Sequence, residues 1–85
     1  MSQWNKLINK ILQLDKNLRY EDLSKALIRI GYVSKQPRGG SSHITFRKKG
    51  QYPITLPKGN PVNTAYIELV REAVEQFESE RDNNE

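Results

Sequence analysis

The first third of the chain places its hydrophobic residues at helical spacing. Apolar side chains recur three and four positions apart in residues 4–14 and again in residues 18–30, with polar residues between them. The first stripe consists of Trp4, Leu7, Ile8, Ile11 and Leu12, and the second of Tyr20, Leu23, Leu27 and Ile30. A turn at Asp15–Asn17 separates the two segments, and Gly31 stands where a helix ends in a residue of positive φ. The pattern therefore predicts two amphipathic helices.

The middle of the chain changes to a period of two. Residues 32–36 ("YVSKQ") predict a short strand, and residues 42–48 ("SHITFRK") predict a second. In the second strand Ile44 and Phe46 point to one face of the sheet. The alternate residues, His43, Thr45 and Arg47, point to the other face.

A third strand is expected at residues 52–56 ("YPITL"), after a tight turn in which Gly50 takes a positive φ. Tyr52, Ile54 and Leu56 are expected to face the core. Because proline has no N–H to donate to a strand ladder, Pro53 favours a place at the edge of the sheet.

Helical spacing returns after the loop Pro57–Pro61, with Asn63 or Thr64 available as an N-cap. The apolar stripe consists of Tyr66, Leu69, Val70, Ala73, Val74 and Phe77, and the outer face of Glu68, Glu72, Glu75 and Glu78. Residues 79–85 are expected to fray as an acidic tail. The predicted order is α-α-β-β-β-α. It describes one α+β domain over residues 1–85, with helices on one face of a three-stranded antiparallel sheet.

Composition narrows the class of protein. A chain of 85 residues suits a single domain, and it contains no cysteine, which excludes disulfides, thiolate catalysis and thiolate zinc sites. It contains no apolar run long enough for a membrane span or a signal peptide. We therefore expect a cytoplasmic protein without a membrane partner.

The net charge of +4 is unevenly distributed along the chain. Residues 35–62 contain no acid, whereas acidic side chains outnumber basic ones in residues 63–85. The basic residues of the middle segment are Lys35, Arg38, Arg47, Lys48, Lys49 and Lys58. Such a segment favours contact with a polyanion. The alternative is a solvated surface that keeps the protein soluble.

The stretch "RGGSSHITFRKK", residues 38–49, contains the only histidine of the chain. Arginine and lysine neutralise phosphate oxygens, and serine hydroxyls and loop amides add contacts. A histidine side chain accepts or donates a proton near neutral pH, and RNA carries its own nucleophile, the 2′-hydroxyl. No metal or other cofactor is required for that reaction, and the sequence offers no cluster of metal ligands. In this interpretation His43 is the catalytic residue, and the contacts to RNA come from Arg38, Ser41, Ser42, Arg47, Lys48, Lys49 and Lys58.

The residues alone leave three functions open. The first is a metal-independent endoribonuclease, and the second is a non-catalytic module that holds structured RNA by its shape and backbone. The third is a protein-interaction domain whose acidic last helix docks a basic partner. The last helix begins "VNTAYIE", without the lysine cluster of a double-stranded RNA binder, which counts against the second function.

The chain resembles the HicA toxins of bacterial toxin–antitoxin modules over about residues 19–77. The features that carry the resemblance are "IRIGYVSK", the G-S-x-H-x-x-F run at residues 40–46, "ITLP" and the closing helix. The resemblance implies a fold similar to a double-stranded RNA-binding domain, cleavage of mRNA, and neutralisation by a HicB-type antitoxin protein. It also implies that His43 is catalytic and that Gly40 shapes the approach of RNA.

Three features depart from that family pattern. Residues 4–14 form an extra N-terminal helix, and Lys58 stands where many members have a histidine. The last helix carries an acidic face where basic residues are common.

Overall fold

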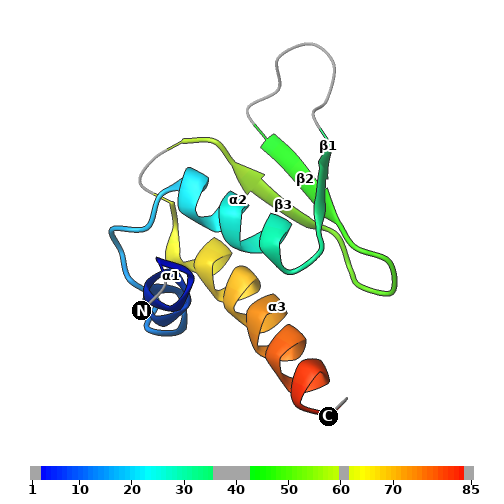
Figure 1. Ribbon diagram of the computed structural model, residues 1–85. Coiled ribbons are helices and arrows are strands. Elements are labelled where there is room, and N and C mark those ends of the chain that lie inside the picture. Colours follow the sequence, from blue (N-terminus) through cyan, green and yellow to red (C-terminus); the bar gives the residue numbers. More distant parts are fainter. Residues whose placement is uncertain (1–2, 36–42, 60–61, 84–85) are drawn as a thin grey trace.

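Three helices and three strands follow one another in the predicted order (Figure 1). The computed structural model describes residues 3–35, 43–59 and 62–83. Within these ranges the elements are α1 (Gln3–Leu12), α2 (Tyr20–Arg29), β1 (Val33–Lys35), β2 (His43–Arg47), β3 (Ile54–Pro57) and α3 (Thr64–Asn83). The expectation of an α+β domain with the order α-α-β-β-β-α is confirmed.

The strands form an antiparallel sheet in which β2 lies between β1 and β3. The pairing of β1 with β2 places Val33 opposite Arg47 and Lys35 opposite Thr45. The pairing of β2 with β3 runs from His43 opposite Pro57 to Phe46 opposite Ile54. The third strand therefore lies at an edge, as its proline predicted.

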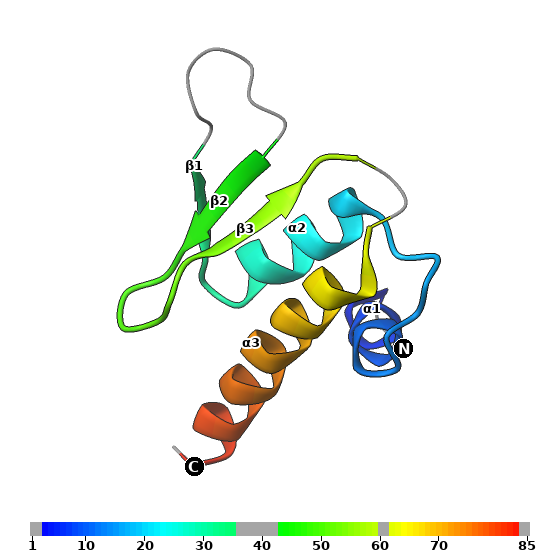
Figure 2. The ribbon, with the colours of Figure 1, turned by 180° about the vertical axis from the view of Figure 1, so that it is seen from behind.

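Helices α2 and α3 cover one face of this sheet (Figures 1 and 2). Ile44 and Phe46 of β2 are buried beneath them, together with Ile54 and Leu56 of β3. Helix α1 packs against α2 and α3, on the far side of α2 from the strands. The result is a sheet with one covered face and one face open to solvent.

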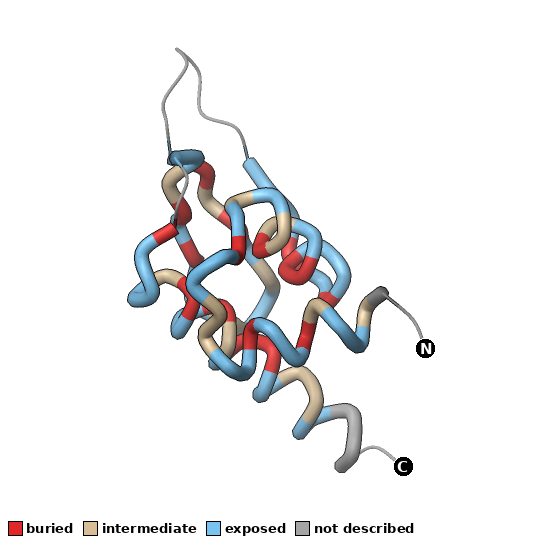
Figure 3. Tube along the Cα trace, turned by 90° about the vertical axis from the view of Figure 1, so that its left-hand side faces the viewer, coloured by how far each residue is buried: buried red, intermediate tan, exposed pale blue. Residues whose placement is uncertain are grey.

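A single hydrophobic cluster joins the three helices and the sheet (Figure 3). Its buried members are Ile8, Ile11, Leu18, Leu23, Ala26, Leu27, Ile30, Tyr32, Ile44, Phe46, Ile54, Leu56, Val62, Ile67, Val70, Ala73 and Val74. No buried polar or charged residue lies among those the structure describes. Over the same ranges no helix is long and apolar enough to span a membrane.

Local interactions fix the ends of the helices. Asn63 caps α3, because its side-chain oxygen accepts a hydrogen bond of 2.9 Å from the backbone N–H of Ala65. Gly31 ends the turn after α2 with a φ of +112°, a conformation that residues with a Cβ rarely adopt. The Asp15 side chain accepts a hydrogen bond of 2.8 Å from the backbone N–H of Asn17, which forms the predicted turn.

The third strand differs from the prediction at its start. Tyr52 was expected in the core, but it lies outside the ladder and is 92% exposed. The register explains the difference, because β3 joins the ladder at Ile54, opposite Phe46, after the turn and Pro53. Pro53 has no N–H with which to extend the ladder toward Tyr52.

The structure also differs from the predicted apolar stripes of the helices at some positions. Leu69 was expected in the core but is 43% exposed, whereas Ile67, absent from the predicted stripe, is fully buried. Ile67, Val70 and Val74 lie three and four positions apart, so burying that row turns Leu69 outward. Leu12 is likewise exposed, at the end of α1. Helix α3 continues to Asn83, through most of the segment expected to fray.

Substitution of Ile54 and Tyr52 tests this boundary of the core. We expect Ile54→Ala to lower the free energy of unfolding by about 2–5 kcal/mol, because it leaves a cavity under the helices. Tyr52→Ala is expected to change it by less than about 0.5 kcal/mol, because the side chain is exposed. Urea denaturation of both variants measures the difference. Equal losses would contradict the position of Tyr52.

Candidate nucleic-acid interface on the open face of the sheet

Strand β2 presents its polar residues to the open face of the sheet. Ile44 and Phe46 are buried, while His43 and Arg47 are exposed and Thr45 is half-buried. This is the alternation that the sequence predicted, and it follows from the two-residue period of a strand. His43 therefore stands at the first position of β2, on the side away from the helices.

The register adds a lysine from β1 to this face. Lys35 pairs with Thr45, and residues directly opposite each other in a sheet project to the same face. Lys35 is exposed and lies diagonal to His43. Diagonal neighbours in a sheet are typically about 7–8 Å apart. The sequence analysis counted the charge of Lys35 but did not place it at the site, because only the strand register reveals which residues it faces.

Strand β3 brings a second lysine to the same end of β2. His43 pairs with Pro57, and such a pair has Cβ atoms about 4.5–5.5 Å apart. Lys58 follows Pro57 directly and is exposed. Because β3 ends at Pro57, the register brings the backbone at Lys58 to the His43 end of β2 without placing its side chain on the open face.

The centre of the open face is held by a pair of threonines. The side-chain oxygens of Thr45 and Thr55 lie 3.1 Å apart, within hydrogen-bond distance, across β2 and β3. Such cross-strand pairs contribute roughly 0.2–1 kcal/mol. The pair links β2, which begins at His43, to β3, which ends one residue before Lys58.

Arg47 and Lys49 lie at the opposite end of β2 from His43. Arg47 is four residues from His43, a separation of roughly 13 Å along a strand. Lys49 lies beyond it, in the turn where the Gln51 N–H donates to the Lys48 carbonyl. These two cations are exposed, and Arg47 lies farther along the sheet from His43 than Lys35 does. They form a second basic zone on the surface.

The structure places Lys48 away from the open face. Its Nζ lies 5.1 Å from the centre of the Phe77 ring and 5.9 Å from the centre of the Tyr32 ring. Its side chain also runs beside Gly31, where an added Cβ would stand 3.3 Å from Cε. Burial raises the pKa of the Tyr32 phenol above its usual value of 10.0, with a further contribution from the charge of Glu80. Lys48 therefore covers the edge of the core instead of standing beside His43.

The remaining residues of the predicted site, Arg38, Gly40, Ser41 and Ser42, lie outside the described residues. Their roles stay predictions. Among the described residues no group of three or more histidine or acidic side chains could hold a metal ion.

Replacement of Lys48 separates a structural role from a role in binding. We expect Lys48→Ala to lower the free energy of unfolding by about 0.5–1 kcal/mol, because contacts with two aromatic rings are lost. Lys49→Ala removes the same charge from an exposed turn position and is expected to change stability by less than about 0.5 kcal/mol. Urea denaturation compares them, and equal stabilities would contradict the structural role of Lys48.

Comparisons of this chain with models of protein families, with curated proteins and with solved structures found no match. The resemblance to HicA toxins therefore stays a prediction based on the residues of the motif. The open face of the sheet, with the exposed His43 and with Lys35 diagonal to it, is the observation on which a functional proposal can rest.

Proposed function

We propose that the protein is a metal-independent endoribonuclease that cleaves mRNA, acting in the cytoplasm as the toxin of a type II toxin–antitoxin system. The observation that carries this proposal is the exposed His43 on the open face of the sheet, with Lys35 diagonal to it on that face. Lys58 comes directly after Pro57, the residue that pairs with His43. The G-S-x-H-x-x-F run that contains this histidine supports it independently.

The chemistry uses the 2′-hydroxyl of the RNA as the nucleophile. A general base removes the proton of this hydroxyl while its oxygen forms a bond to the adjacent phosphorus. The bond from phosphorus to the 5′-oxygen breaks, and a general acid supplies a proton to that oxygen. The products are a 2′,3′-cyclic phosphate and a 5′-hydroxyl, so no water and no metal enters this step.

His43 has the side chain best suited to proton transfer on this surface. An imidazole acts as a general base when neutral and as a general acid when protonated. It cannot hold both roles in the same transition state, so a second group is needed. The extra charge that develops on the phosphate oxygens is stabilised by cations beside them.

Lys58 is our candidate for that second group. It follows the residue that pairs with His43, whereas Arg47 and Lys49 lie at the far end of the strand. An ammonium group at this position can donate a hydrogen bond to a phosphate oxygen and a proton to the departing 5′-oxygen. Lys35 approaches from the other strand and would neutralise the neighbouring phosphate.

A HicB-type antitoxin protein is the proposed partner. It would silence the enzyme by covering the open face of the sheet, because a protein seated there buries His43 and displaces RNA from the lysines. The helices would remain available for additional contacts. A complex that left His43 exposed and RNA cleavage intact would contradict this proposal for inhibition.

Substitution of His43 tests the catalytic role. We expect His43→Ala to reduce RNA cleavage by about 100- to 10,000-fold, the usual contribution of a general acid or base, while the protein stays folded. Cell growth after induced expression compares the toxicity of wild type and variant, and circular dichroism checks that both are folded. The ends of the cleaved RNA are analysed in the presence of a chelator. Cleavage products with 3′-hydroxyl ends would contradict the mechanism. Equal cleavage by both proteins would favour a binding module without chemistry.

The role of Lys58 is tested against a lysine at the other end of the site. We expect Lys58→Ala to lower the rate of cleavage of bound RNA by about tenfold or more, because a cation beside the reacting phosphate is lost. Lys49→Ala should weaken RNA binding and reduce the dependence of that binding on salt concentration. It should leave the single-turnover rate of cleavage, measured at saturating protein, unchanged. Equal effects of the two substitutions on that rate would exclude a distinct role for Lys58.

A further inference from the structure

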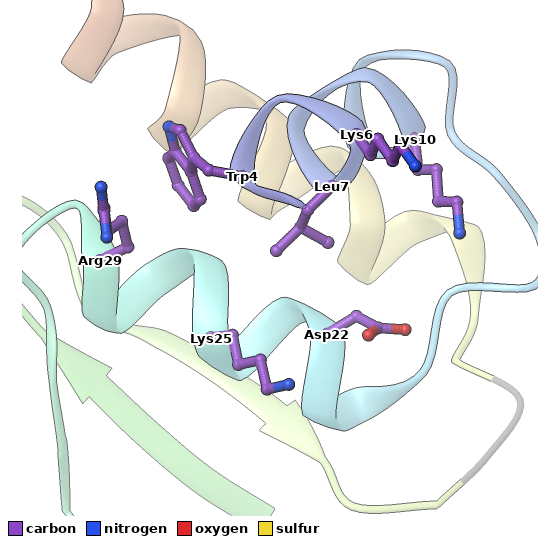
Figure 4. A pocket seen from close by; sticks show the side chains of 7 residues that line it. All are labelled: Trp4, Lys6, Leu7, Lys10, Asp22, Lys25 and Arg29. Atoms are coloured by element: carbon purple, nitrogen blue, oxygen red, sulfur yellow. The ribbon is translucent and has the colours of Figure 1, made fainter. Parts of the chain in front are cut away.

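A groove with a volume of about 480 Å³ lies between α1 and α2 (Figure 4). Helix α1 contributes Trp4, Lys6, Leu7 and Lys10, and helix α2 contributes Asp22, Lys25 and Arg29. The strands lie on the far side of α2 from this groove (Figures 1 and 2). It is therefore separate from the open face that carries His43.

Four cations line the groove against one carboxylate. Lys6 and Lys10 are one helical turn apart on α1, and Lys25 and Arg29 are one turn apart on α2, so each pair spans about 6 Å. The carboxylate of Asp22 already accepts a hydrogen bond of 3.1 Å from the backbone N–H of Arg19, at the start of α2.

The groove also has an apolar part. The side chain of Leu7 points into the space between the helices (Figure 4). Trp4 stands at one end, where the guanidinium carbon of Arg29 lies 5.4 Å from the centre of its ring. A flat group can contact the indole and the guanidinium at this end, since both are planar and stack on aromatic rings.

We propose that this groove binds a nucleoside polyphosphate, with its phosphates on the lysines and its base beside Trp4. The volume lies in the range of about 300–1,000 Å³ that is usual for small-molecule sites. The two pairs of cations are confined to one helical turn on each side, which suits a compact anion of high charge. An RNA strand or an acidic helix would extend beyond these pairs, where the groove supplies no further lining residues.

A ligand in this position would join α1 to α2. Without a ligand, α1 contacts α2 directly, and its side chains Ile8 and Ile11 belong to the hydrophobic cluster. A compound that binds the folded protein alone raises its stability as the ligand concentration exceeds the dissociation constant. Binding should therefore raise the melting temperature, whether or not the open face has ribonuclease activity.

The groove contains its own reporter, because Trp4 is the only tryptophan of the chain. We would titrate the full-length protein with ATP and GTP, following indole fluorescence and, independently, the heat of binding. Adenosine, which lacks phosphates, and tripolyphosphate, which lacks a base, are the matched ligands. The expected result is saturable binding of the nucleotides, weaker binding of tripolyphosphate and no binding of adenosine.

Two exposed lysines of the groove serve as variants. Lys10→Ala and Lys25→Ala should each weaken nucleotide binding by about tenfold, as expected for the loss of a charge-assisted contact. Lys16→Ala removes an equal charge from an exposed position outside the groove and should leave the affinity within about twofold. Circular dichroism checks that each variant is folded.

Three results would overturn the proposal. The first is the absence of saturable nucleotide binding in both fluorescence and calorimetry. The second is equal loss of affinity in Lys16→Ala, which would indicate attraction to the net charge alone. The third is tighter binding of polyglutamate or of an RNA oligonucleotide with the same dependence on Lys10 and Lys25, which would assign the groove to an acidic protein segment or to RNA.

Discussion

The burial of Ile44 and Phe46 under the helices is the constraint on which the rest of the structure depends. These two side chains are almost completely removed from solvent, and they belong to the central strand of the sheet. Because successive residues of a strand alternate between faces, burying this pair forces His43, Thr45 and Arg47 onto the opposite side. A slip of one residue would exchange the two faces, so core packing and the candidate site are fixed together.

The same strand decides which cations lie close to the histidine. Charge along the sequence groups Arg47, Lys48 and Lys49 with His43, but strand geometry separates them. Lys48 packs against Tyr32 and Phe77 at the edge of the core, and the other two cations lie at the far end of the strand. Lys35 of β1 shares the open face with His43, and Lys58 follows the residue of β3 that pairs with it.

Helix α1 forms a basic groove with α2, apart from the open face of the sheet. It packs on the helical layer, where Lys6 and Lys10 line a groove together with Lys25 and Arg29 of α2, and Trp4 stands at one end of this groove. The two basic surfaces lie on different sides of the molecule, separated by the hydrophobic cluster that joins the helices and the sheet. One surface carries a histidine suited to proton transfer, and the other combines cations with an indole ring.

The sequence by itself determined the class and order of the elements, since the change from helical to alternating spacing and back is a local property. It also determined the exposed face for His43 and the edge position of β3, which follow from alternation and from Pro53. Only the tertiary structure decided that Ile67 is buried where Leu69 was expected, and that Tyr52 lies outside the core. The phase of a helix and the register of a strand depend on what packs against them, and neighbours across a sheet come from distant parts of the chain. For this reason the position of Lys35 diagonal to the histidine could not be identified from spacing along the sequence.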